Sequence, residues 1–337
     1  MTNQSSISNH QSAIRASAPG SLMLLGEHAV LHGRRALVCA IDKRITVLLS
    51  QINKPVLRIV SDLGDYEASL GELTDHPDFR FVLDAVKQYP LEQGIELKIE
   101  SEFSSDIGFG SSAAVTVATH AALMKSGSFG EFAPPGRATS PTEPFQMELF
   151  KRSLATIHRV QGRGSGADVA ASVFGGVVAY RAEPLEIKPL KQTFPLTAVY
   201  SGSKMKTAEV IALVELARAA NPEKYERIFD EIDAGVGEVL SSFGGTAAST
   251  SAGTEAGAPP LQVLGEMLVC NQKLMEEMGL CNAALAEIIE GFQVLGTPAK
   301  ISGSGLGDCA IGLGRFSSSG KFPAYFLRVS GQGAVAF

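Results

Sequence analysis

The chain has 337 residues, of which 45% are hydrophobic and 19% charged, a balance typical of a globular protein long enough for two domains. Its 29 basic and 35 acidic residues give a formal net charge of −6 without a dense cluster of Lys and Arg, which argues against a nucleic-acid-binding surface. No apolar run reaches the roughly 18 residues that a membrane-spanning helix needs, so no membrane association is expected.

The amino-terminal residues 1–16 are polar and lack the apolar core of a secretory signal. The cysteines show no Cys-x-x-Cys pairing, which disfavours both a disulfide framework and a zinc knuckle. We therefore expect buried free thiols in a cytoplasmic protein. The cysteines are Cys39, Cys270, Cys281 and Cys309.

An apolar strand is predicted in SAPGSLMLLGEHAVLHG, residues 17–33. Glu27 and His28 follow its apolar run, and such a pair is suited to hydrogen bonds with hydroxyls or with a carboxylate. A purely structural contact between the two side chains is equally compatible with this chemistry. Further strands are predicted by β-branched or alternating residues at 35–50, 55–61 and 94–102.

The stretch SDIGFGSSAAVTVATHAALM, residues 105–124, predicts a glycine turn followed by a buried helix. Backbone N–H groups around Gly108 and Gly110, together with the positive end of the helix dipole, favour a bound phosphate. The hydroxyls of Ser111 and Ser112 add hydrogen-bond donors or a metal ligand. A capped helix after a tight turn is the alternative, since neither a P-loop nor a dinucleotide-binding motif is complete.

A surface loop is predicted at residues 126–144, which are rich in Pro, Gly and Ser, and a helix at 145–162. The second glycine cluster, QGRGSGADVAASVFGG at residues 161–176, contains one acid, Asp168, at the start of a small-residue helix. This carboxylate could cap the helix, or in a phosphate site it could act as base or orienter for an attacking hydroxyl. A strand is predicted next, at 176–182.

Two strands predicted within residues 185–203 join the halves of the chain. We therefore predict a first domain at residues 14–190 and a second at 191–337. Within the second domain, residues 241–260 have the composition of a flexible linker or loop between two helical stretches.

The last part of the chain contains a helical pattern and a third glycine cluster. Residues 261–279 carry apolar residues at helical spacing and end at Gly279, a suitable C-terminal cap. The cluster KISGSGLGDCAIGLG, residues 300–314, lies between two apolar runs. It fits a backbone loop that covers a ligand from the second domain.

Four segments, taken in order, resemble the GHMP small-molecule kinases, the family of galactokinase, homoserine kinase, mevalonate kinase and phosphomevalonate kinase. They are APGSLMLLGEHAVLHG, IGFGSSAA, GSGADVAASVFGG and KISGSGLGDC, and they span nearly the whole chain. The resemblance implies an α+β fold of two domains, the first like domain 2 of ribosomal protein S5 and the second ferredoxin-like, with the active site in the cleft between them. It also implies ATP as co-substrate, with Mg²⁺.

The resemblance implies roles for individual residues. Asp168 falls on the catalytic Asp of the family. The ATP-phosphate loop corresponds to Gly108, Gly110, Ser111 and Ser112, and a hydroxyl of Ser111 or Ser112 would serve as a magnesium ligand. The substrate-binding positions are Glu27, His28, Thr207, Gly303, Ser304 and Gly305.

The segment GEHAVLHG resembles mevalonate kinases, whereas galactokinases continue with an Asp-Tyr pair. This implies ATP-dependent phosphorylation of the 5-hydroxyl of mevalonate, giving 5-phosphomevalonate, in the mevalonate pathway of isoprenoid biosynthesis. The pattern around Asp168 also resembles phosphomevalonate kinases, whose acceptor would need extra cations. Arg163, Lys204 and Lys206 are available for this, so a phosphomevalonate kinase or a related ATP-dependent decarboxylase stays open as an alternative.

Two positions depart from the family pattern. Ser21 stands where mevalonate kinases usually have a lysine, and Ile157 stands where animal-type enzymes have a magnesium-binding Glu. Because neither side chain supplies the expected charge, a nonenzymatic ligand sensor on the same fold is a further hypothesis. A small molecule is the expected partner, mevalonate or a related acid, and a homodimer is compatible with the resemblance.

Overall fold

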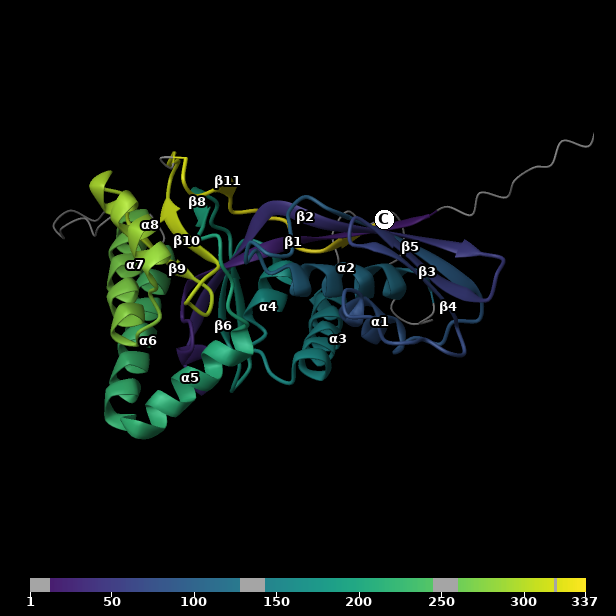
Figure 1. Ribbon diagram of the computed structural model, residues 1–337, viewed down its shortest axis with the longest axis horizontal. Coiled ribbons are helices and arrows are strands. Elements are labelled where there is room, and N and C mark those ends of the chain that lie inside the picture. Colours follow the sequence, from purple (N-terminus) through teal and green to yellow (C-terminus); the bar gives the residue numbers. More distant parts are fainter. Residues whose placement is uncertain (1–12, 128–142, 245–259, 318–319) are drawn as a thin grey trace, which may run out of the picture.

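The structure is a computed structural model that describes residues 13–127, 143–244, 260–317 and 320–337. These residues form two β-sheets with helices packed on both, so the predicted α+β class is confirmed. The N-terminal half denotes here the part built on the eight-stranded sheet, and the C-terminal half the part built on the four-stranded sheet. Figure 1 shows an elongated molecule with these two parts at opposite ends.

The eight-stranded sheet has the order β12-β1-β2-β5-β3-β4, with β6 paired to β2 and β7 paired to β6. β3 and β5 run parallel, and the other pairs are antiparallel. Its strands are β1 (Ile14–Leu25), β2 (Ala36–Ile52), β3 (Val56–Ser61), β4 (Gly64–Ser69), β5 (Gly94–Ser101), β6 (Val177–Arg181), β7 (Glu186–Leu190) and β12 (Val335–Ala336).

The four-stranded sheet is antiparallel throughout and has the order β11-β8-β10-β9. Its strands are β8 (Pro195–Tyr200), β9 (Ala299–Ser302), β10 (Cys309–Leu313) and β11 (Ala324–Arg328). The chain passes from the first sheet to the second between Leu190 and Pro195, and the domain division after residue 190 stays a prediction. The last strand, β12, returns to pair with β1 in the first sheet.

Helices cover one face of the first sheet and pack against the second (Figure 1). The N-terminal half contains α1 (Arg80–Val86), α2 (Ser111–Lys125), α3 (Glu143–Gln161) and α4 (Ala167–Phe174), and a short 3-10 turn, η1 (Ala29–His32). The C-terminal half contains α5 (Thr207–Ala220), α6 (Pro222–Gly244), α7 (Pro260–Glu277) and α8 (Ala283–Val294). Within the described ranges, no helix combines the length and apolar character that crossing a membrane requires.

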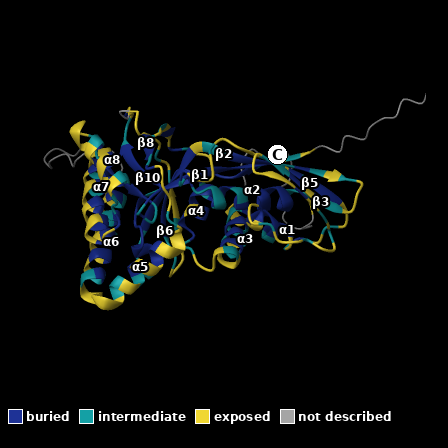
Figure 2. Ribbon diagram, viewed as in Figure 1, coloured by how far each residue is buried: buried dark blue, intermediate teal, exposed yellow. Residues whose placement is uncertain are grey.

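Helix α2 is buried along most of its length (Figure 2). It packs against β1 and β2 on one side and against α3 and α4 on others. Because it is surrounded, its Ala, Val and Thr residues need no polar face, unlike those of a surface helix. This packing holds the N-terminus of α2 in a fixed position at the junction of the two halves.

The two halves share a hydrophobic cluster. Leu22 and Leu24 of β1 belong to the same buried cluster as Leu196 of β8, Val236 of α6 and Leu264 of α7. Burying apolar surface of both halves in one cluster contributes on the order of 25 cal/mol per Å² to their association. The junction is therefore part of the core of the protein.

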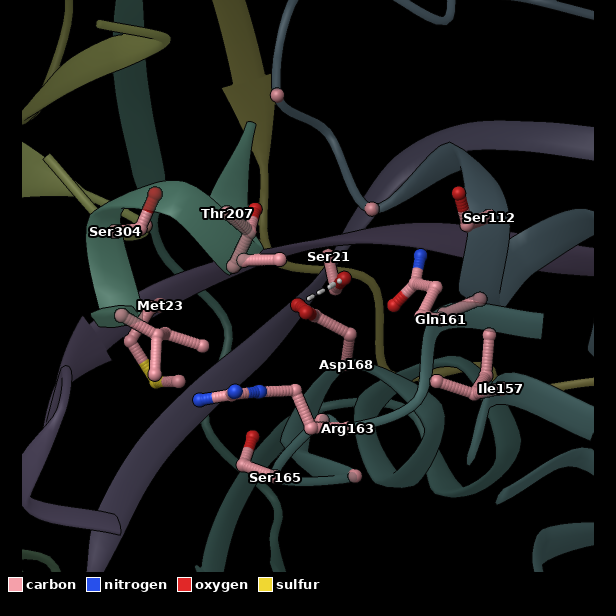
Figure 3. A pocket seen from close by; sticks show the side chains of 18 of the residues that line it. Ser21, Met23, Ser112, Ile157, Gln161, Arg163, Ser165, Asp168, Thr207 and Ser304 are labelled. Atoms are coloured by element: carbon pink, nitrogen blue, oxygen red, sulfur yellow. Dashed lines mark hydrogen bonds between the residues drawn. The ribbon is translucent and has the colours of Figure 1, made fainter. Parts of the chain in front are cut away.

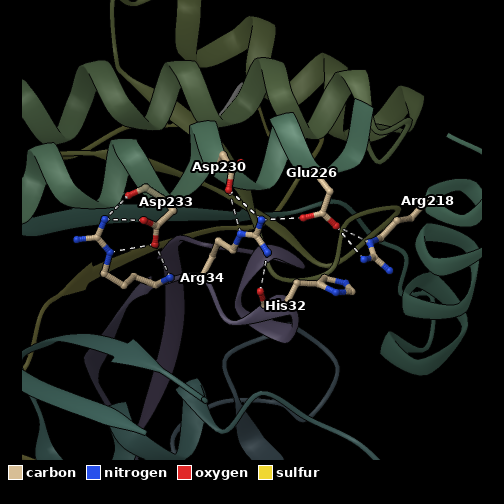
Figure 4. Close-up of polar contacts among 7 residues, drawn as sticks. His32, Arg34, Arg218, Glu226, Asp230 and Asp233 are labelled. Carbon is tan, nitrogen blue, oxygen red and sulfur yellow. Dashed lines mark hydrogen bonds and ion pairs between the residues drawn. The ribbon is translucent and has the colours of Figure 1, made fainter. Parts of the chain in front are cut away.

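Ion pairs at the start of β2 reinforce this junction (Figure 4). The guanidinium of Arg35 donates hydrogen bonds of 2.9 and 2.6 Å to the two carboxylate oxygens of Asp233 on α6. Arg34 donates to Glu226 at 2.7 Å and to Asp230 at 2.9 Å, on the same helix. Paired, charge-assisted hydrogen bonds of this kind fix orientation as well as distance.

The strands predicted at 35–50, 55–61 and 94–102 are confirmed as β2, β3 and β5, and the helix after the first glycine cluster as α2. The predicted helices at 145–162 and 261–279 are confirmed as α3 and α7, and the strand at 176–182 as β6.

Two predicted loops are wrong at their ends. Pro144 already lies in α3, residues 241–244 lie in α6, and Pro260 begins α7. Proline fits the first turn of a helix, where its missing N–H has no helical partner. Residues 128–142 and 245–259 of these loops lie outside the described residues.

The cysteines are free, as predicted. Their predicted burial is confirmed for Cys39 and Cys309 but is wrong for Cys281, which is only half-buried, and for Cys270, which is exposed on α7. Helical periodicity places that residue on the outer face of the helix, away from Leu264 and Leu268.

Candidate active site

A cleft with a cavity volume of about 470 Å³ lies where the two halves meet. Its walls come from β1, from the N-terminal turns of α2, α4 and α5, from α3, and from the loop between β9 and β10. This size is within the range of small-molecule sites. The predicted residues that line it are Glu27, His28, Gly108, Gly110, Ser111, Ser112, Asp168, Thr207, Gly303 and Ser304.

Gly305 is the one predicted site residue that does not line the cleft. Its backbone has a φ of +88°, and a Cβ added there would lie 2.7 Å from the Cβ of Leu280. The glycine therefore allows the loop to pass close to Leu280, on the side facing away from the cleft.

The first glycine cluster leads into α2 through two residues with left-handed backbone. Gly110 is the N-cap of α2 with a φ of 64°, and no side chain caps this end. A Cβ at Gly110 would lie 2.1 Å from the Oγ of Ser21, so only glycine lets the turn lie against β1. The N–H groups at the start of α2 are left for a ligand, and Ser111 and Ser112 beside them line the cleft.

Asp168 lies in the first turn of α4 and faces the cleft (Figure 3). The N-cap of α4 is Gly166, without a side-chain cap, so the capping role considered for Asp168 is not observed. Instead, the hydroxyl of Ser21 donates a hydrogen bond of 2.8 Å to Oδ1 of Asp168. Protein around the carboxylate desolvates it and raises the pKa of Asp168, while the Ser21 hydrogen bond acts in the opposite direction.

Glu27 forms an ion pair with Lys300 of β9, and both side chains are almost wholly buried. Burial raises the pKa of Glu27 and lowers that of Lys300, and the attraction between the two opposes each shift. Glu27 thus borders the cleft with one carboxylate oxygen held by the C-terminal half. The pair satisfies a charge on each side that would otherwise be buried alone.

His28 connects the same two segments. Its backbone has a φ of 59°, and its Nε2 lies 2.9 Å from the carbonyl oxygen of Ser304. The ring nitrogen donates this hydrogen bond, because a carbonyl oxygen only accepts. Burial lowers the pKa of His28, which favours the neutral ring. The structural contact considered between Glu27 and His28 is replaced by contacts of each residue with the third glycine cluster. Glu27 pairs with Lys300, and His28 is hydrogen-bonded to Ser304.

The three cations considered for the acceptor all line the cleft. Lys204 donates a hydrogen bond of 3.2 Å to the carbonyl oxygen of Ser105, and Lys206 lies 3.9 Å from Glu209 in an exposed ion pair. Arg163, in the second glycine cluster, has no ion pair with any residue that the structure describes, and Figure 3 shows its side chain extending into the pocket near Asp168.

Ile157 lies on α3 at the wall of the cleft and is 6% exposed. Its apolar side chain provides no ligand for a metal ion. Among the residues that the structure describes, no three His, Cys, Asp or Glu side chains gather into a metal site. The oxygen donors that face the cleft are carboxylates and hydroxyls, which suit Mg²⁺ when phosphates and water complete its coordination.

Sequence reasoning missed Asp308 in the third glycine cluster. It lines the cleft, is 7% exposed, and its Oδ1 has no hydrogen-bond partner within the described part of the chain. Its only sequence signal is that it is the sole acid in that cluster. The partner of Glu27 was missed as well, although Lys300 begins the same cluster.

Comparison with known proteins places this cleft in a family. The model described as GHMP kinases N terminal domain matches residues 79–176, and that described as GHMP kinases C terminal matches residues 260–335. A galactokinase galactose-binding signature also matches residues 5–51.

The chain is 33% identical over 302 residues to mevalonate kinase of Archaeoglobus fulgidus, covering 88% of this chain and 91% of that protein. It is 29% identical over 316 residues to mevalonate kinase of Pyrococcus furiosus, covering 88% of each. The crystal structure of Methanococcus jannaschii mevalonate kinase matches the fold with a TM-score of 0.74 at 21% identity, covering 95% of this chain and 99% of that one. On these grounds, the chain belongs to the GHMP kinase family of small-molecule kinases.

Proposed function

We propose that this kinase transfers the terminal phosphoryl group of ATP to the 5-hydroxyl of mevalonate, giving 5-phosphomevalonate. The observation that carries the proposal is the position of Asp168, which faces the N-terminus of α2 across one cleft, with Ser21 hydrogen-bonded to it. The curated relatives at 33% and 29% identity are both named mevalonate kinase.

The phosphate chain of ATP would bind at the first glycine cluster. The N–H groups at the start of α2 and the helix dipole attract an anion, and Ser111 and Ser112 add hydroxyl donors. A hydroxyl of Ser111 or Ser112 would hold Mg²⁺, which when bound neutralises charge on the phosphates. Catalysis then rests mainly on positioning and on stabilisation of charge.

Asp168 would orient the acceptor hydroxyl and accept its proton. The carboxylate must be ionised for this, and the Ser21 hydrogen bond favours the ionised form. A raised pKa makes Asp168 a better proton acceptor than an ordinary carboxylate. Ser21 acts on the reaction through Asp168, as a neutral hydrogen-bond donor in place of the usual lysine.

The acceptor would lie between Asp168 and the C-terminal half. Mevalonate carries a carboxylate, and Arg163, which lines the cleft, is a cation without an ion-pair partner among the described residues. Thr207, at the start of α5, adds a hydroxyl and the N-terminal end of a helix. We propose that these groups, with Glu27, His28, Gly303 and Ser304, form the acceptor side of the site.

A coupled assay of ADP release tests the proposal by comparing mevalonate with phosphomevalonate as acceptor. We expect phosphorylation of mevalonate and loss of about 10²–10⁴-fold in kcat in Asp168→Asn. Asp62→Asn is the matched control, because Asp62 lies in the exposed turn between β3 and β4. Turnover with phosphomevalonate but not with mevalonate would make phosphomevalonate the acceptor. Binding of ATP without turnover of any alcohol would favour a nonenzymatic ligand sensor.

A further inference from the structure

Asp308 has a backbone conformation that an aspartate rarely adopts. Its φ is 59°, in the left-handed region, where the Cβ of a residue other than glycine comes too close to the following carbonyl oxygen. Its neighbours Gly305 and Gly307 also have positive φ values, and for glycine this is free of strain. Non-glycine residues held in such conformations cluster at functional sites.

The side chain of Asp308 contacts the first glycine cluster from the other half of the molecule. A Cβ added at Gly108 would lie 2.9 Å from the Cβ of Asp308 and 3.1 Å from its Oδ1. Only glycine at position 108 therefore leaves room for this carboxylate. Asp308 lies beside the turn at which the phosphates of the nucleotide would bind.

The charge of Asp308 is poorly balanced in this position. Its buried Oδ1 has no hydrogen-bond partner among the described residues, and it forms one long ion pair, of 3.8 Å, with the ammonium of Lys204. Burial raises the pKa of Asp308, Lys204 opposes the shift, and the negative charge of Asp168 adds to it. Two carboxylates thus face one cleft in which a polyphosphate must also bind, and their charges would repel it.

A divalent cation between these groups removes the conflict. Mg²⁺ in nucleotide sites is held by one or two carboxylates together with phosphate oxygens and water. Ile157 cannot provide such a carboxylate from α3. Asp308 can, because its carboxyl group lies beside Gly108 and the residue lines the same cleft as Ser111 and Ser112.

We propose that Asp308 is a carboxylate ligand of the divalent cation that accompanies the bound nucleotide. Asp308, in the C-terminal half, thereby provides the metal-binding carboxylate that Ile157, in the N-terminal half, lacks. The proposal rests on the proposed function in so far as it assumes a nucleotide at the first glycine cluster. Binding of the metal–nucleotide complex then depends on both halves of the molecule.

The test measures the affinity of the full chain for Mn²⁺·ADP. Binding is detected by the enhancement of water proton relaxation as the protein is titrated into the Mn²⁺·ADP solution. We expect Asp308→Asn to weaken binding of Mn²⁺·ADP at least about tenfold, since a metal ligand is lost. Binding of ADP in the presence of EDTA, measured by calorimetry, should not weaken. Asp62→Asn is the control with the same change of charge on an exposed turn.

Asparagine and glycine both tolerate the left-handed backbone at this position, so Asp308→Gly serves as the second variant if Asp308→Asn unfolds at a lower temperature. Unchanged Mn²⁺·ADP affinity in a folded variant overturns the proposal, and so does equal weakening with EDTA present. The acceptor assay is independent of this titration. If the protein phosphorylates no mevalonate but needs Asp308 to bind Mn²⁺·ADP, this inference stands and the proposed function is wrong. If it phosphorylates mevalonate but binds Mn²⁺·ADP equally well without Asp308, the proposed function stands and this inference is wrong.

Discussion

The hydroxyl of Ser21 donates a hydrogen bond of 2.8 Å to the carboxylate of Asp168, so residues on β1 and α4 meet at the point where a cation would have been expected. The carboxylate is thereby held by a neutral group and keeps a raised pKa. This relationship makes the dependence of turnover on pH a direct probe of the site.

Replacing Ser21 by Ala should move the acid limb of the profile of kcat/KM against pH to higher pH. The hydrogen bond lowers the pKa of Asp168, so its loss raises that pKa further, and the ionised carboxylate forms only at higher pH. Initial rates with mevalonate across the acid range measure the shift. Ser17→Ala, earlier on the same strand and outside the cleft, should leave the limb in place, and an unshifted limb in Ser21→Ala would falsify the coupling.

Replacing both Ser111 and Ser112 by Ala should raise the KM for ATP about tenfold, the equivalent of about 1.4 kcal/mol, because hydroxyl donors to phosphate are lost. The KM for mevalonate should change less. The control is Ser126→Ala at the opposite end of α2, where the dipole disfavours an anion. Unchanged ATP kinetics in the double variant would exclude these hydroxyls from the phosphate site.

Replacing Arg163 by Gln should raise the KM for mevalonate about tenfold or more while the KM for ATP stays the same. A charged partner for a carboxylate contributes about 1.5–3 kcal/mol when solvent is excluded. Steady-state kinetics with each substrate varied in turn measure both constants. Arg58→Gln on β3 is the matched control, since its partner is Glu96 on β5. A rise in the KM for ATP instead would place the guanidinium on the nucleotide.

Replacing Arg35 by Gln should lower the free energy of unfolding by about 1–3 kcal/mol at neutral pH, since the guanidinium makes two hydrogen bonds to the carboxylate of Asp233. Burial acts to raise the pKa of Asp233, but the hydrogen bonds and charge of Arg35 outweigh it and lower that pKa. A carboxylate with a depressed folded-state pKa stabilises the fold above the unfolded pKa of 3.8, and this stabilisation is lost as the pH falls from there through the lower folded-state pKa.

The difference between wild type and Arg35→Gln should therefore shrink as the pH is lowered below about 4, in urea unfolding monitored by circular dichroism. The control is Arg227→Gln, whose ion pairs with Glu231 and Glu277 lie at the exposed surface, and it should cost less. A difference that stays constant with pH would assign the loss to packing of the Arg35 side chain.

The three glycine clusters could be found from the sequence because each is a local pattern of turn and helix start. Gly108, Gly110, Ser111 and Ser112 are close in sequence, and their geometry follows from one helix terminus. The relationships between clusters could not be found in this way. Glu27 and Lys300 are separated by 273 positions, and only the packing of β1 against β9 brings them together.

Asp308 illustrates the same limit from another direction. Its type and position are visible in the sequence, but its effect depends on Gly108, which has no side chain with which to signal a contact. The observed departure at Ile157 was visible, whereas a carboxylate on the opposite wall of the cleft was not. Sequence therefore predicts what each segment can do, and the fold decides which segments act together.

The pairing of β12 with β1 has a consequence for how the protein is made. Ala16 and Ser17 pair with Ala336 and Val335, so the edge of the first sheet is completed by a strand that follows the C-terminal half in the sequence. The strand that carries Ser21 is thus fully paired only after the C-terminal half has been synthesised. Until β12 docks, a nascent chain presents an open strand edge of β1 to its neighbours, so pairing of β12 protects it against aggregation.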